Sequence, residues 1–171
     1  MRIMGIDPGI ATVGFGVIDS EKNRLKLVST GVIETPAHTS LSSRLDRIYD
    51  DTQELISTFS PDVVSVEELF FKKNITTGIS VAHGRGVVLL ACYKAGVQIF
   101  EYTPMQVKQA VVGYGLAEKK QVIYMVTSIL NMKSPPKPDD AADALALAIC
   151  HARSTTSLIY KNGGDDPCST T

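Results

Sequence analysis

The chain contains few cysteines and no long apolar run. Its 171 residues include three cysteines, Cys92, Cys150 and Cys168, whose spacing matches neither a metal-binding motif nor a paired disulfide framework. No secretory signal follows Met1, and no uninterrupted apolar stretch is long enough to span a membrane. These absences favour a protein of the reduced cytoplasm.

An excess of positive charge is also lacking. The net charge at pH 7 is −1, so the chain does not have the overall basic character of many nucleic-acid-binding proteins. This weighs only weakly against DNA, because binding depends on a local basic face rather than on the total charge. The length favours a single domain with a substantial core, and we find no internal repeat.

Four acidic residues beside apolar sequence are the most informative feature that is present. Asp7 ends an apolar run and precedes Pro8-Gly9, and Glu67 ends a second run. Asp140 and Asp143 share one face of an Ala/Leu-rich helix. A buried carboxylate is costly unless it is compensated, and a pocket of like charges suits hard divalent cations. If the fold brings the four together, they predict metal-dependent chemistry on a phosphate.

The periodicity of apolar residues predicts an α/β fold. Three leading strands are followed by alternating helices and strands, which indicates a mixed sheet flanked by helices. The expected strands cover residues 2–7, 12–18, 25–35, 63–67 and 97–102, and the expected helices cover 41–59, 75–95, 105–112, 118–130 and 139–153. Residues 154–171 are polar and glycine-rich, so we expect a mobile tail there.

Five motifs in a fixed order resemble the RuvC-type Holliday junction resolvases. They are GIDPG, E-x-L-F after the fourth strand, QVKQAVVGYG, AEKKQV and DAADALALA, and the resemblance covers residues 1–153. It implies an RNase H-like fold, with a five-stranded mixed sheet whose first three strands are antiparallel. It also implies a structure-selective endonuclease that resolves Holliday junctions in recombination and repair. Paired, symmetric cuts would leave 5′-phosphate and 3′-hydroxyl ends.

The resemblance assigns catalytic and metal-binding roles to Asp7, Glu67, Asp140 and Asp143. It implies Mg²⁺, with two ions per site and Mn²⁺ as a substitute. Asp139 is the competing candidate for Asp140, although it also fits a first-turn acid that the helix dipole favours. Each carboxylate taken alone also fits a turn, a solvated strand end or a charged helix start.

The resemblance also implies four DNA contacts. Phe70 matches an aromatic position that contacts unpaired bases, although a core role is the alternative for this side chain. Lys73, Lys108 and Lys119 match basic positions, and the latter two are implied to contact backbone phosphates. A lone lysine is equally compatible with a solvated surface.

The expected partners are a four-way DNA junction and a second copy of the chain, and the resemblance also implies a branch-migration helicase complex. A two-fold symmetric junction calls for two active sites related by a matching axis. Helix 75–95 is the expected dimer element. Its apolar faces carry Ile79, Val87, Leu90 and Ala91, and Gly84 and Gly86 allow close approach. Burial of one helix face against its own sheet is the alternative.

We also considered an ATPase and a non-catalytic nucleic-acid-binding protein, and we considered the packing of three tyrosines. An actin-like or sugar-kinase-like ATPase shares the opening Asp-Pro-Gly turn, but 171 residues leave no room for its second subdomain. A non-catalytic member of the same fold is disfavoured because all four acidic positions are filled. We expect Tyr93, Tyr114 and Tyr124 to be half-buried packing residues.

Overall fold

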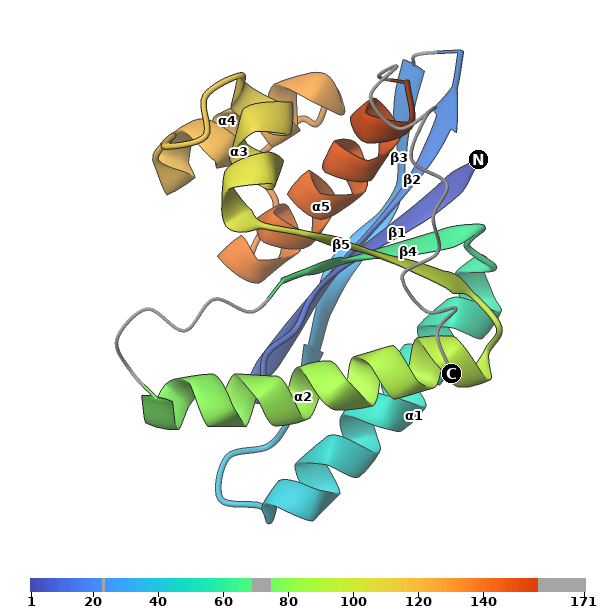
Figure 1. The fold of residues 1–171 in the computed structure, drawn as a ribbon, viewed down its shortest axis with the longest axis vertical. Coiled ribbons are helices and arrows are strands. Elements are labelled where there is room, and N and C mark those ends of the chain that lie inside the picture. The colour runs from blue at the N-terminus through green and yellow to red at the C-terminus, as the bar shows by residue number, and fades with distance from the viewer. Residues whose placement is uncertain (23, 69–74, 157–171) are drawn as a thin grey trace, which may run out of the picture.

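The computed structural model describes residues 1–22, 24–68 and 75–156, which form one sheet with helices on both sides (Figure 1). The strands are β1 (Arg2–Asp7), β2 (Thr12–Glu21), β3 (Arg24–Glu34), β4 (Val63–Glu67) and β5 (Gln98–Tyr102). The helices are α1 (Leu41–Phe59), α2 (Ile75–Lys94), α3 (Pro104–Val112), α4 (Lys119–Ile129) and α5 (Asp139–Thr156).

The sheet is mixed, in the order β3-β2-β1-β4-β5. The first three strands pair antiparallel, whereas β4 runs parallel to both β1 and β5. This confirms the expected five-stranded mixed sheet. Because β1 and β4 are parallel neighbours, their last residues lie side by side at one edge of the sheet.

Two hydrophobic layers enclose the sheet. Alternate residues of β1 point to opposite faces, so Ile3 packs with α3, α4 and α5 while Met4 packs with α1 and α2. Figure 1 shows the same division, with α3, α4 and α5 on one side of the sheet and α1 and α2 on the other. The strand face that carries Ile3 also carries Asp7, four residues later.

Three glycines allow α5 to lie almost directly on β1 and β2. A Cβ placed on Gly5 would stand 1.9 Å from the carbonyl oxygen of Ala144, and one on Gly16 would stand 2.6 Å from the Leu145 side chain. A Cβ on Gly14 would stand 2.0 Å from the carbonyl oxygen of Asp140. Only glycine permits so close an approach, which holds the start of α5 against the end of β1.

The element boundaries differ little from those expected, and α5 runs to Thr156, beyond the expected end at 153. Residues 157–171 lie outside the described residues, so the tail stays a prediction. The three tyrosines were predicted wrongly: Tyr93, Tyr114 and Tyr124 are 79%, 57% and 72% exposed. On α4, for example, Val122 and Val126 face the core, so Tyr124 between them projects into solvent.

Candidate active site

Asp7 and Glu67 end the two neighbouring parallel strands β1 and β4. The register pairs Ile6 with Val66, and continuing it by one residue sets Asp7 beside Glu67. Both carboxylates therefore leave the sheet on the face that α5 covers. Glu68 is exposed, and its backbone N–H donates to the Tyr102 carbonyl at 2.9 Å. Glu67, and not Glu68, lines the cavity described next.

The first turns of α5 bring two more carboxylates to the same edge of the sheet. Asp7, Glu67 and Asp143 line one cavity of about 190 Å³. Its other walls come from α3, α4 and α5, through Pro104, Val107, Lys108, Lys119, Val122, Ala146 and Leu147. Asp140 is half-buried and is absent from this lining, but its negative charge acts on both Asp7 and Asp143.

The electrostatics of the cluster are those of crowded, buried anions. The pKa of Asp7 is raised to about 8, first by burial and then by the nearby charges of Asp143, Glu67 and Asp140. Burial is also the first cause of the raised pKa of Glu67, followed by the charge of Asp143. The pKa of Asp143 is raised mainly by burial as well. Burial and mutual repulsion therefore both oppose the ionised forms of these carboxyl groups.

Two lysines supply positive charge beside these carboxyl groups. Lys119 begins α4, and its Nζ lies 2.9 Å from Asp143 Oδ2 and 3.6 Å from Asp139 Oδ2. Lys108 on α3 lines the cavity, and its charge lowers the pKa of Glu67. Both lysines were singled out as DNA contacts, and the structure places both at the carboxylates.

Asp139 and Asp140, the two candidates for one metal-binding position, differ in exposure and in backbone contacts. Asp139 opens α5, its side chain is 63% exposed, and it pairs with Lys119. Asp140 lies above Gly14, the residue paired with Asp7 in the β1–β2 ladder. Asp140 is therefore the one whose backbone is seated on the strand beside Asp7.

The donor set suits a hard cation in its chemistry. Every candidate ligand is a carboxyl oxygen, and a bound cation would favour the ionised form of Asp7 that burial and its acidic neighbours now oppose. In the described part of the chain, however, no three acidic, histidine or cysteine side chains stand close enough to enclose one ion. Lys119 lies against Asp143 instead, so ion binding requires these side chains to rearrange.

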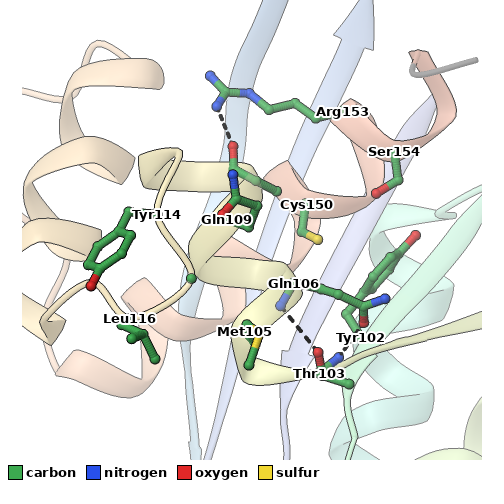
Figure 2. Close-up of a pocket in the computed structure, with 12 residues that line it drawn as sticks. Tyr102, Thr103, Met105, Gln106, Gln109, Tyr114, Leu116, Cys150, Arg153 and Ser154 are labelled. Atoms are coloured by element: carbon green, nitrogen blue, oxygen red, sulfur yellow. Dashed lines mark hydrogen bonds between the residues drawn. The ribbon is translucent and has the colours of Figure 1, made fainter. Parts of the chain in front are cut away.

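A larger cavity lies on the other side of α3 and has a different character. It measures about 730 Å³, and Figure 2 shows Met105, Tyr114, Leu116 and Tyr102 around it. Most of its wall is apolar, and its only charged lining residue is Arg153. Helix α3 thus separates this groove from the carboxylates, since Lys108 on the same helix lines the acidic cavity. No carboxyl group of the described residues lines this cavity, unlike the acidic one.

The sequence did not single out Arg85, which contacts the site from behind. Its Nε donates to the carbonyl oxygen of Glu67 at 3.2 Å, and its guanidinium pairs with Glu101. An arginine between two glycines in an apolar helix was the available signal. Phe70 and Lys73, by contrast, lie outside the described residues, and their roles stay predictions.

Comparison with known proteins identifies the family. A family model described as crossover junction endodeoxyribonuclease RuvC matches residues 3–151. The chain belongs to the RuvC family. This membership confirms the resemblance drawn from the five motifs and with it the nuclease class, and it gives no support to the ATPase alternative.

Individual RuvC proteins are similar along most of their length. The crossover junction endodeoxyribonuclease RuvC of Ruminiclostridium cellulolyticum is 56% identical over 154 residues, which are 90% of this chain and 93% of that protein. The structure of Thermus thermophilus RuvC is 39% identical, with a TM-score of 0.84, and the match covers 91% of this chain and 96% of that one.

A second structure of Thermus thermophilus RuvC holds that protein in complex with a Holliday junction substrate. It is also 39% identical, with a TM-score of 0.85, over 91% of this chain and 94% of that one. These matches confirm the RNase H-like fold expected from the sequence. Among the described residues, no helix is long and apolar enough to cross a membrane.

Proposed function

We propose that this RuvC-family chain resolves four-way DNA junctions by hydrolysing phosphodiester bonds at Asp7, Glu67, Asp140 and Asp143. The supporting observation is the convergence of carboxylates from β1, β4 and α5 at one edge of the sheet. These segments are far apart in sequence, and their shared burial and repulsion cost stability. A cluster that weakens the fold is more simply explained by chemistry than by structure.

The proposed cofactor is Mg²⁺, with two ions per site and Mn²⁺ as a substitute. The four carboxylates would hold these ions, since hard divalent cations prefer oxygen ligands. When bound, the ions supply hydroxide near neutral pH and offset negative charge on the leaving 3′ oxygen. Held there, the ions would also offset the negative charge of the carboxylates, so that a phosphate would no longer be repelled.

The two lysines in the cavity have a proposed role in substrate binding. Lys119 is paired with Asp143 in this structure, 2.9 Å away. If Asp143 were engaged as a metal ligand, the Lys119 ammonium would be available to bind a backbone phosphate. Lys108 faces the same cavity from α3. Phosphate contacts of this kind position DNA without reading its sequence.

Phe70 and Lys73 complete the proposed DNA surface. They stand three and six residues after Glu67 in the sequence, outside the described residues. Phe70 is proposed to stack on an unpaired base at the crossover, a contact worth on the order of 1–3 kcal/mol. Lys73 is proposed to bind a phosphate nearby.

A homodimer is the proposed assembly, with α2 as its contact. The exposed side of α2 carries Ile79, Leu90 and Tyr93, which are 50%, 48% and 79% exposed, and a Cβ on Gly86 would meet no described atom within 4 Å. Two other residues expected there face inward. Ala91 is fully buried, and Gly84 packs against the carbonyl of Gly9. The expectation that one face of this helix packs on its own chain therefore holds.

The proposed function is tested with a labelled four-way junction beside a linear duplex of the same sequence. With Mg²⁺ the protein should cut the junction in two strands of like polarity, leave ends that a ligase rejoins, and spare the duplex. With EDTA it should cut neither. Equal cutting of both substrates would exclude structure selectivity.

A branch-migration helicase complex is the proposed cellular partner.

A further inference from the structure

Arg85 contacts the end of β4 from the face opposite the carboxylates. It lies on α2, and only 15% of its side chain is exposed. Its Nε donates to the Glu67 carbonyl at 3.2 Å, and Nη2 pairs with Glu101 of β5. One guanidinium therefore joins the last residue of β4 to its neighbour strand. The planar guanidinium presents donors in a fixed fork that suits two acceptors at once, whereas a lysine ammonium holds them with less defined geometry.

The point of contact is the residue whose orientation matters most. Glu67 is the last residue of β4, and a strand end has fewer ladder hydrogen bonds than a strand centre. Anchoring its carbonyl restricts movement of the Glu67 backbone, and with it the point from which the side chain leaves the strand. The buried carboxylate then points into the cavity shared with Asp7 and Asp143.

The neighbouring residue of α2 holds the other strand end. A Cβ on Gly84 would stand 2.4 Å from the carbonyl oxygen of Gly9, in the turn that follows Asp7. Two consecutive residues of α2 thus touch the backbone beside Asp7 and Glu67. This is contact with the supports of both carboxylates, made without entering the cavity.

We propose that Arg85 is a positioning residue that sets the Glu67 carboxylate for divalent-cation binding. The proposal rests on the proposed role of Glu67 as a metal ligand. Residues that orient metal ligands typically change metal affinity or activity by 10–100-fold when they are removed. The contact is to backbone, so a loss near the lower end of that range is expected.

The test compares Arg85→Gln, Arg85→Lys and a matched control, Arg47→Gln. Arg47 also pairs with an acid, Asp51 at 3.4 Å, but on exposed α1. Two readouts are taken: the Mg²⁺ concentration for half-maximal junction incision, and the Mg²⁺-induced rise in Tm of the DNA-free protein. Junction affinity without metal is measured beside them.

Arg85→Gln should raise the half-maximal Mg²⁺ concentration roughly 10-fold and reduce the Mg²⁺-induced rise in Tm. Arg85→Lys should recover part of both effects, and Arg47→Gln should change neither. Junction affinity should stay within about twofold of wild type, because no phosphate contact is lost. Unchanged Mg²⁺ dependence in Arg85→Gln would overturn the proposal.

Two further outcomes have distinct meanings. Arg85→Gln could lower Tm and junction affinity in parallel while the protein that remains folded responds to Mg²⁺ as wild type does. Arg85 would then be only structural, and the proposal would fail. Glu67→Gln is run in the same assays. If it too binds Mg²⁺ normally, the proposed role of Glu67 fails; if Glu67→Gln alone loses Mg²⁺, only the role of Arg85 fails.

Discussion

Gly14 carries the start of α5: a Cβ on this residue would stand 2.0 Å from the carbonyl oxygen of Asp140. Gly14 is also the residue paired with Asp7 across the β1–β2 ladder. The strand partner of Asp7 therefore also contacts the backbone of Asp140. The separation of Asp7 from the α5 acids is set by backbone packing, which no side-chain rotation can adjust.

Gly14→Ala should consequently damage both stability and incision. The added methyl group overlaps a backbone oxygen, so α5 must move, at a cost of about 2–3 kcal/mol in unfolding free energy. Gly31→Ala is the control, because the atom nearest its Cβ, at 2.9 Å, belongs to the movable Phe15 ring. Urea unfolding should show a cost below about 1 kcal/mol there. Equal costs would mean that the α5 contact is not rigid.

Asp7→Asn should stabilise the protein in the absence of divalent metal. The pKa of Asp7 is about 8 in the folded state against an ordinary value of 3.8, so the folded state holds an extra proton between these values. Stability therefore falls as pH rises from about 4 to 8, and removing the acid removes that loss. Urea unfolding in EDTA should show a gain on the order of 2 kcal/mol at pH 8 and almost none at pH 4.

Magnesium should reverse the ranking of the same two proteins. Bound cations stabilise the folded state of wild type by mass action, whereas Asp7→Asn has lost a proposed ligand. Wild type should gain several degrees in Tm with saturating Mg²⁺, and the variant should gain much less. Equal gains would contradict the proposed role of Asp7.

Asp140→Asn should impair incision far more than Asp139→Asn. Asp140 acts electrostatically on Asp7, whereas Asp139 is mostly exposed and pairs with Lys119. Losing an exposed pair costs about 0–1 kcal/mol, and losing a metal ligand costs most of the activity. Single-turnover incision at saturating protein separates the two. Similar defects would show that the assignment across Asp139-Asp140 is wrong.

Lys108→Ala and Lys119→Ala should weaken junction binding evenly across junction sequences. Each phosphate contact releases about one counterion, so the slope of log K against log salt should become shallower by roughly one per lost contact. For a dimer the change approaches about two for each lysine. Lys120→Ala, on the exposed side of the same helix start, is the control. Cleavage positions should survive, and a variant with moved cut sites at unchanged affinity would exclude this role.

The elements of the fold were predictable because their signals are local. Alternation along β2 and the apolar spacing of Leu41–Phe59 need only neighbouring residues, and these elements appear as expected. The order of five motifs supplied the topology. The exposure of Tyr124 was not predictable in this way, because it depends on which face of α4 meets the core.

The site was predictable in its members and not in its supports. Asp7, Glu67 and Asp143 are conspicuous carboxylates beside apolar runs, and they do share a cavity. The close contact of Gly14 with the Asp140 backbone joins residues that are far apart in sequence, and so does the hydrogen bond from Arg85 to Glu67. Contacts between backbone and distant side chains leave no local pattern, so only the structure reveals them.

The most direct test of the central claim is single-turnover incision of one labelled four-way junction by wild type, Asp7→Asn, Glu67→Gln and Asp143→Asn, with junction affinity measured for each. If the carboxylates form one metal-dependent site, each variant should lose at least about 100-fold in rate. Each should also bind the junction as tightly as wild type or more tightly, because negative charge has been removed. A variant that cuts at near the wild-type rate, or one whose incision falls only as far as its binding, would contradict the claim.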